Sequence, residues 1–318
     1  MPRYELGTVA ASEAILTDLY INLRRAIAQW AAVTQQTPQA RMGYIGQHLT
    51  SVVTGFPGGR SGARGKDLLL PDDKYAEIKT CYRVDQLGSC SNCGQAVASI
   101  ELVCPLCGSD VINRKDDSKW LIGPRTEEEL GELWEPASFY LVLFDFADLR
   151  DPRQINARIW KVDPRSRGFA YALVDYYFNI RAKSTSKAPF NLWPFSFKFG
   201  LLGGDLIYSA TINENDEIET HLFPSERGES EPIRLEPLTT YAKSTALTNA
   251  GLLSAAHTLG SAIEGTRSEL LVALQEARGS GTFSDSQLQD ALAEGVYGPL
   301  VADYRDRLPE PVREPYAQ

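Results

Sequence analysis

The sequence predicts a mixed α/β fold in which the last third of the chain is helical. Short strand-like apolar runs alternate with amphipathic helical stretches over the first two thirds, and a helical pattern with a capping signature fills the C-terminal third. No internal repeat or low-complexity tract is present. With 318 residues and 43% apolar side chains, the chain can fill one large core or two ordinary ones, which excludes a wholly disordered protein.

The N-terminal part is expected to hold two helices, an exposed loop and a hairpin, at residues 12–33, 40–53, 55–66 and 67–83. The first helix is predicted because Ile15, Leu19, Leu23, Ile27 and Trp30 recur at spacings of three and four. The loop is rich in glycine, which neither a helix nor a strand tolerates well. The hairpin turns at Pro-Asp-Asp-Lys, residues 71–74, which are turn-forming residues.

The middle of the chain is expected to alternate strands and helices, and the end to be helical. We expect a helix start at 126, strands at 138–146, 157–162 and 205–212, a helix at 167–180, an irregular aromatic stretch at 189–199, an acidic loop at 213–236, and helices within 240–278 and 284–308. Ser284 and Gln287 form a capping-box pattern that predicts the start of the last helix. The predicted domains are residues 1–212, with a small insertion at 88–112, and residues 213–318.

The charge of the chain is strongly uneven. The formal net charge is -9, yet residues 150–200 hold ten Lys and Arg against three Asp, whereas residues 205–318 hold eight basic and nineteen acidic residues. Such a charge asymmetry is typical of a protein that binds a polyanion through one face. Unevenly charged solvated surfaces would give the same numbers of charged residues. The longest apolar runs have six residues and the N-terminus lacks a signal-peptide core, so we expect a cytoplasmic protein with no membrane partner.

Four of the five cysteines form two C-x2-C-Gly knuckles, separated by ten residues. Cys90 and Cys93 make the first knuckle, and Cys104 and Cys107 the second. This doubled spacing predicts a tetrahedral four-cysteine site for structural Zn²⁺. The alternatives, disulfides or a redox pair, fit neither the spacing nor a reducing compartment. Cys81 is expected to be a buried thiol without a ligand.

The predicted hairpin carries a cluster of charged side chains. Glu77 and Lys79 are two residues apart on one strand and therefore project from the same face. A three-residue turn would place Asp67 opposite Glu77. Two carboxylates and an ammonium suit Mg²⁺-dependent phosphodiester hydrolysis. A surface ion-pair network is the alternative interpretation.

Asp67 followed by Glu77-x-Lys79 resembles the PD-(D/E)xK signature of restriction-endonuclease-like nucleases, although Lys66 replaces the proline. Pro71-Asp72 matches the signature literally but lies at the hairpin tip, so Asp67 is preferred. With the two knuckles that follow, residues 55–108 resemble the MamI-type family of type II restriction endonucleases, with an inserted zinc ribbon.

The resemblance implies a restriction-endonuclease-like mixed sheet flanked by helices, within residues 1–212. It also implies a homodimer that cleaves double-stranded DNA at a short interrupted palindrome within a restriction-modification system. Asp67 and Glu77 would bind Mg²⁺, and Lys79 would assist the attacking water. A helix that precedes the hairpin is usual in this superfamily, and its Gln47 or His48 would add a polar residue to the metal site. ATP is not expected, because the glycine loop lacks two residues of the phosphate-binding pattern.

Two basic segments are the predicted DNA contacts. They are Arg60, Arg64 and Lys66 in the glycine loop, and Arg181, Lys183, Ser184 and Lys187 in the middle of the chain. Arg165, Arg167 and Lys243 are weaker candidates, and His257 is expected to be a core residue. A solvated loop would explain the second segment equally well. A zinc-ribbon DNA-binding regulator and a structure- or modification-directed nuclease remain the alternative functions.

Overall fold

The computed structural model describes residues 4–36, 40–60, 66–84, 86–98, 101–114, 117–149, 151–224, 230–261 and 265–317. The chain forms two compact units, each built from separate segments. Unit 1 contains Met1–Trp120, Phe139–Lys161 and Leu206–Glu231, and unit 2 contains Leu121–Ser138, Val162–Asp205 and Pro232–Gln318. These units differ from the predicted single division after residue 212, and the assignment of catalysis and DNA binding to residues 1–212 stays a prediction.

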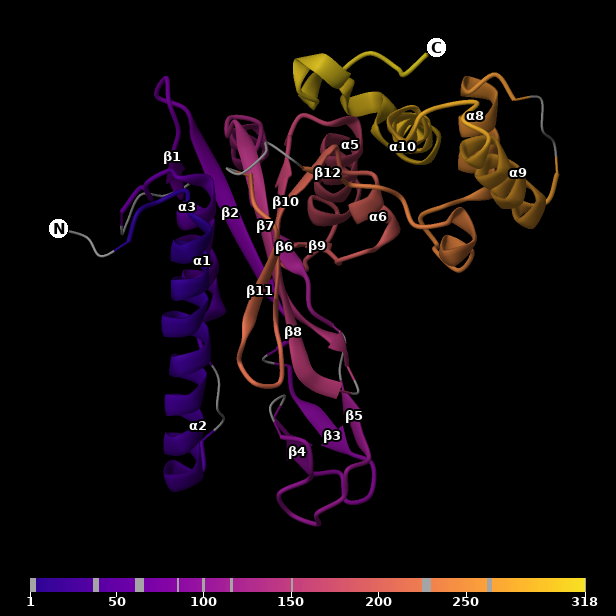
Figure 1. Cartoon of the computed structure of the whole chain (residues 1–318). Helices are drawn as coiled ribbons and strands as arrows, with labels where there is room; N and C mark the ends of the chain where they lie inside the picture. Colours follow the sequence, from indigo (N-terminus) through magenta and orange to yellow (C-terminus); the bar gives the residue numbers. More distant parts are fainter. Residues whose placement is uncertain are drawn as a thin grey trace. The chain divides into compact units, whose positions relative to one another are not determined.

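Helices and a long sheet form most of unit 1 (Figure 1). The predicted N-terminal helix is one continuous run of α1 (Val9–Ile15), a π-helical stretch (Leu16–Asn22) and α2 (Leu23–Thr34). The second predicted helix is α3 (Met42–Thr54), which ends at Gly55 in the left-handed conformation that favours glycine. Among the described residues, no helix combines the length and the apolar character that crossing a membrane requires.

The main sheet has the strand order β1-β2-β7-β8-β10-β11, with β12 paired to β10. The strands are β1 (Leu68–Leu69), β2 (Tyr75–Tyr82), β7 (Ser138–Asp148), β8 (Asp151–Val162), β10 (Gly204–Ile212), β11 (Ile218–Leu222) and β12 (Glu231–Pro232). β11 and β12 lie in the stretch predicted to be a loop, so that prediction was wrong. The side chain of Asn213 accepts the N–H groups of Asn215 and Glu217, a turn that returns the chain into β11.

The core of unit 1 lies between these helices and one face of the sheet. Leu16, Tyr20 and Leu49 from the helices are buried with apolar residues of β2 and β7. The Tyr20 ring stacks on Phe144 of β7, with centroids 5.7 Å apart. Alternate residues of β2 therefore face this core, which leaves Glu77 and Lys79 on the opposite face.

The cysteine-containing segment forms a separate small sheet in unit 1, in the order β4-β3-β5. β3 (Gly88–Cys90) pairs antiparallel with β4 (Ala96–Val97) and β5 (Ile112–Arg114). Its buried cluster consists of Cys90, Val97 and Cys104, with Ile112 packed against them. Such a small cluster buries too little apolar surface to stabilise the module alone.

Unit 2 is mainly helical, as the sequence predicts for its C-terminal part. Its longer helices are α4 (Glu127–Glu132), α5 (Arg167–Asp175) with a π-helical extension (Tyr176–Arg181), α8 (Asn249–Thr258), α9 (Arg267–Gly279) and α10 (Asp285–Val301). Short 3-10 turns occur at Leu238–Tyr241, Ala302–Arg307 and Glu310–Val312. Ser284 and Gln287 form the predicted capping box at the start of α10.

The aromatic stretch 189–199 is more regular than the sequence predicts. It contains β9 (Phe190–Leu192), which pairs with β6 (Trp120–Ile122), and α6 (Phe197–Gly200). Phe190 and Leu192 are buried on either side of a half-buried Asn191, the alternation of a strand. Ser196 caps α6 by accepting the N–H of Phe199. Pairing with β6 and the local Ser196 cap thus order a segment that the sequence predicts to be irregular.

Candidate functional site

The β1–β2 hairpin has the register that a three-residue turn predicts. Leu68 pairs with Ala76 and Leu69 with Tyr75, so the next pair along places Asp67 opposite Glu77. The amide of Leu70 donates to the carbonyl of Lys74, which closes a three-residue loop at residues 71–73. Asp72 and Asp73 adopt positive φ angles in this loop, where polar turn residues are tolerated. Asp72 is exposed at the tip of the hairpin, away from the paired Asp67.

Two N–H donors hold the Asp67 carboxylate. The backbone N–H of Ile78 donates to Oδ2 at 2.8 Å, and the Gln47 side-chain amide donates to Oδ1 at 3.1 Å. Gln47 is one of the two residues proposed to assist from the preceding helix, whereas His48 is exposed. These bonds orient the carboxylate and leave each oxygen with further acceptor capacity, since a carboxylate oxygen can accept more than one bond.

Glu77 and Lys79 form a half-buried ion pair beside Asp67. The Lys79 ammonium lies 2.5 Å from Glu77 Oε1, and the side chains of Lys79 and Glu77 are 31% and 16% exposed, respectively. Burial raises the pKa of Glu77, Lys79 opposes that rise, and the nearby charge of Asp67 adds to it. The site therefore holds more negative charge than Lys79 neutralises, and its hard oxygen atoms fit a divalent cation such as Mg²⁺.

Close packing of α3 on β2 brings Gln47 to this site. A Cβ atom added at Gly46 would lie 2.2 Å from Oγ1 and 2.9 Å from Cγ2 of Thr80, so only glycine allows this approach. Gln47 follows Gly46 on the helix, and Thr80 follows Lys79 on the strand. The small residue at position 46 therefore sets the distance between α3 and β2.

The basic residues of the glycine loop are only partly described. Arg60 is exposed and has a positive φ of 64°, and Lys66 places its ammonium 5.3 Å from the centroid of the Tyr75 ring. Arg64 lies outside the described residues. Arg60 and Lys66 thus remain accessible cations of unit 1 on either side of the residues that are not described, and Lys66 immediately precedes Asp67.

The second basic segment belongs to unit 2. Arg181 donates to the carbonyl of Ser186, and Lys183 donates to the Asn179 side chain at 2.9 Å. Ser184 Oγ accepts the N–H of Ser186, and Lys187 is exposed. The segment is therefore a folded loop with cations on its surface, and their contact with DNA stays a prediction.

Several weaker candidates have structural roles. Arg167 is 8% exposed and bonded to Glu294 and Tyr171, so its proposed role in DNA binding does not fit its burial. Arg165 pairs with Asp163.

His257, expected in the core, is exposed because it lies on the outer side of α8. Lys243 is exposed, and Cys81 is buried as predicted.

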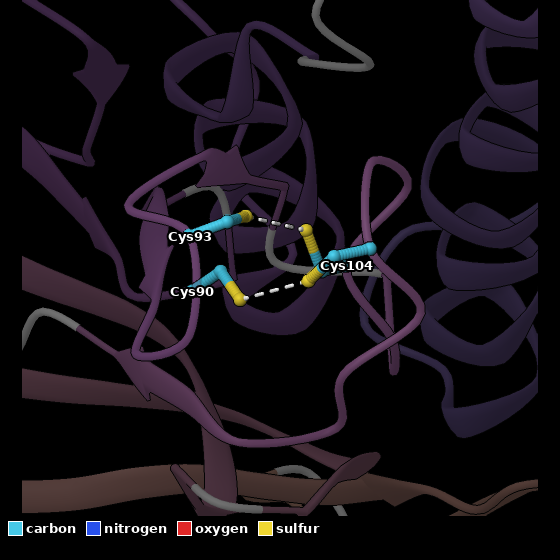
Figure 2. Close-up of side chains that lie close together, drawn as sticks. Cys90, Cys93 and Cys104 are labelled. Carbon is cyan, nitrogen blue, oxygen red and sulfur yellow. Dashed lines mark hydrogen bonds between the residues drawn. The ribbon is translucent and has the colours of Figure 1, made fainter.

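The four knuckle cysteines converge as predicted (Figure 2). Their sulfur atoms all lie within 4.8 Å of one another, and the Cys90–Cys107 and Cys93–Cys104 sulfurs are 3.6 Å apart. That separation exceeds a disulfide bond, and it is close to the ~3.8 Å between sulfurs bound tetrahedrally at a Zn–S distance of ~2.3 Å. The cluster can therefore hold a metal ion.

The backbone of the two knuckles stabilises cysteine thiolates. Gly94 and Gly108 have φ angles of 76° and 70°, in the left-handed region that favours glycine. Backbone N–H groups of the knuckles lower the pKa of Cys90 and of Cys107, the latter to about 6. These donors stabilise the deprotonated sulfur that binds a metal.

Unit 2 also contains a cavity that the sequence does not predict, lined among others by Trp193, Asn191 and Lys198. These residues were assigned to an irregular aromatic stretch, because none of them belongs to a spaced motif. The one available signal was the combination of cations, hydroxyls and aromatic rings between residues 181 and 198.

Comparison with known proteins agrees with the hairpin geometry. The family model for the MamI restriction endonuclease matches residues 29–240, two thirds of the chain. The type II restriction enzyme MamI of Microbacterium ammoniaphilum is 29% identical over 173 residues, which cover 54% of this chain and 50% of that enzyme. The alignment thus spans about half of the relative's length. No solved structure matches this chain. Because the family model covers both the hairpin and the cysteine cluster, the chain belongs to the MamI restriction endonuclease family.

Proposed function

We propose that this protein is a type II restriction endonuclease that cleaves both strands of DNA at a short interrupted palindrome, with Mg²⁺ as the catalytic ion. The observation that carries the proposal is the hairpin cluster, in which Asp67 is fixed by Gln47 and Ile78 beside the Glu77–Lys79 pair. Family membership and the name of the relative support the same activity.

In this proposal, Asp67 and Glu77 hold Mg²⁺, which when bound supplies positive charge for the scissile phosphate. Gln47 and the Ile78 N–H keep the Asp67 carboxylate in one orientation. Glu77 positions the Lys79 ammonium, which donates a hydrogen bond to the attacking water and orients it. Arg60, Arg64 and Lys66 precede this site and contact the DNA backbone, and Arg181, Lys183, Ser184 and Lys187 contribute further contacts.

The assembly we propose is a two-fold homodimer, since a palindrome is matched by a protein of the same symmetry and each subunit then cuts one strand. The cluster of four cysteines binds structural Zn²⁺, which stabilises a module whose own core is very small. The reaction needs no ATP. A reducing bacterial cytoplasm, as part of a restriction-modification system, is the setting that suits free thiolates.

The proposal is tested with purified protein, unmethylated phage-sized DNA and Mg²⁺, followed by sequencing of the DNA ends. We expect discrete fragments that share one palindromic motif. Lys79→Ala should abolish cleavage while DNA binding remains, and Lys161→Ala, at an exposed site on β8, should cleave normally. Cleavage by Lys79→Ala would move the active site elsewhere. Intact DNA at every protein concentration would favour a zinc-ribbon regulator, and cleavage only of modified or branched DNA would indicate a different nuclease.

A further inference from the structure

A cavity of about 430 Å³ lies within unit 2, away from the hairpin residues in the chain. It is formed by the end of the π-helical stretch, the loop that follows, β9, the start of α6 and residues 244–246. Its volume is within the range of pockets that hold small molecules. None of the roles proposed above requires a concave pocket of this kind.

The wall of the cavity combines three kinds of side chain. Aromatic rings come from Tyr176, Phe190 and Trp193, and the first two meet edge to face at 5.6 Å. Hydrogen-bonding groups come from Asn191 and from several serine and threonine hydroxyls, and positive charge comes from Arg181 and Lys198. Among the described residues, no carboxylate lines the cavity. This chemistry selects a flat, hydrogen-bonding and anionic ligand, which describes a nucleotide.

Lys198 and Asn191 are available to such a ligand. The Lys198 ammonium lies 4.9 Å from the centroid of the Phe190 ring, and within the described part of the chain its side chain forms no hydrogen bond or ion pair. Burial lowers the pKa of Lys198, and the charge of Asp175 only partly opposes this. The side-chain amide of Asn191 likewise has no hydrogen-bond partner in the segments that the structure describes. A half-buried ammonium without an acceptor is stabilised by an arriving anion.

A second hollow of unit 2 shares Tyr176, Arg181 and Pro189 with the cavity and adds Arg125 and Lys187. Its described lining again contains no acidic residue. Positively charged side chains therefore extend from the cavity into the second hollow. The phosphates that flank a bound nucleotide in a DNA strand would require such charges. A free metabolite has no flanking phosphates and would not need the cations of the second hollow, whereas a nucleotide within a DNA strand would need them.

We infer that this cavity receives one nucleotide extruded from the DNA substrate, with its base against the exposed Trp193 ring and its flanking phosphates on Arg181, Lys198 and the cations of the second hollow. The inference rests on the proposed function for the identity of the polymer. Asn191 and the hydroxyls would read the edge of the base. The protein would then recognise its target partly by the base that the cavity accepts.

The first test needs no knowledge of the target sequence. Each of the four deoxynucleoside 5′-monophosphates is mixed with the protein, and saturation-transfer NMR detects binding through the base protons. We expect binding that Lys198→Met and Trp193→Ala each weaken about tenfold, because stacking and charge are both lost. Lys161→Met, at an exposed lysine of unit 1, is the matched control and should bind as the wild type does. Thermal unfolding of each variant verifies its fold.

Three results would overturn the inference at this stage. The first is the absence of binding for all four nucleotides, and the second is equal binding by the variants and the wild type. The third is binding of inorganic phosphate without any signal from the base protons of the nucleotides, which would make the cavity an anion site only.

The second test separates extrusion from the nuclease proposal. Once the cleavage site is known, 2-aminopurine replaces each base of that site in turn, and fluorescence is recorded with Lys79→Ala protein. We expect one position to brighten, and Lys198→Met in the same background to suppress the signal. A duplex that the wild type cleaves without any bright position would refute extrusion and leave the nuclease standing. Nucleotide binding without any cleavage would retain the cavity assignment and refute the nuclease.

Discussion

Substitution of Gly46 by alanine tests the helix-strand contact on which the hairpin site depends. The new Cβ would lie 2.2 Å from Thr80 Oγ1 and 2.9 Å from its Cγ2, where a normal contact is ~3.5 Å. Relief of such an overlap costs about 1–3 kcal/mol in a packed site, and the higher helix propensity of alanine returns about 1 kcal/mol. We therefore expect Gly46→Ala to lower the free energy of unfolding by about 1 kcal/mol.

Gly43 provides the matched control, because it lies on the same helix and a Cβ there would meet nothing within 4 Å. Gly43→Ala should therefore stabilise the protein by about 0.5–1 kcal/mol. Thr80→Ala removes both overlapping atoms, so the double variant with Gly46→Ala should regain stability, with a coupling of about 1–2 kcal/mol. Urea unfolding gives all four values. Equal effects of Gly46→Ala and Gly43→Ala, or no coupling with Thr80, would refute the close contact.

Three other predictions concern the two candidate metal sites. Gln47→Leu should slow cleavage about tenfold with little loss of DNA binding, because Asp67 Oδ1 loses its donor; unchanged single-turnover rates would contradict this. Cys104→Ser should reduce the zinc content from one ion per chain and lower the melting temperature; elemental analysis without zinc in the wild type would refute the cluster. Burial raises the pKa of Glu77, so its charged form destabilises the fold. Glu77→Gln should therefore stabilise the protein at pH 7. This gain in the free energy of unfolding should vanish below pH 4.5, the ordinary pKa of the carboxyl group. Urea unfolding across pH verifies it, and a gain that is independent of pH would be evidence against it.

The sequence was sufficient wherever a short-range pattern determines the structure. The hairpin register follows from the turn length and from alternation along the strand, so Asp67 could be placed opposite Glu77 in advance. The cysteine cluster is likewise local, since two knuckles converge when a metal-binding module folds. Gln47 could be named only as one of two neighbours, because the helix phase relative to the strand depends on the tertiary contact at Gly46.

Long-range features were beyond the sequence. β11 was missed because its five residues include Glu219 and His221, and the acidic composition of the surrounding stretch suggested a loop. Arg167 was taken for a surface cation, since nothing nearby in sequence indicates that Glu294 will pair with it from 127 positions away. The cavity of unit 2 escaped notice for the same reason, because residues 244–246 complete its wall.

The interleaving of the two units along the chain has a consequence for biosynthesis. The chain passes between them after residues 120, 138, 161, 205 and 231. On a ribosome, the main sheet cannot be completed until β12 has emerged, by which time part of unit 2 is already exposed. The hairpin with Asp67 and Glu77 is among the earliest parts made, yet its supporting sheet is among the later parts finished. A nascent chain therefore carries its predicted catalytic residues long before the sheet that supports them is complete, and neither unit can be expressed as one uninterrupted fragment.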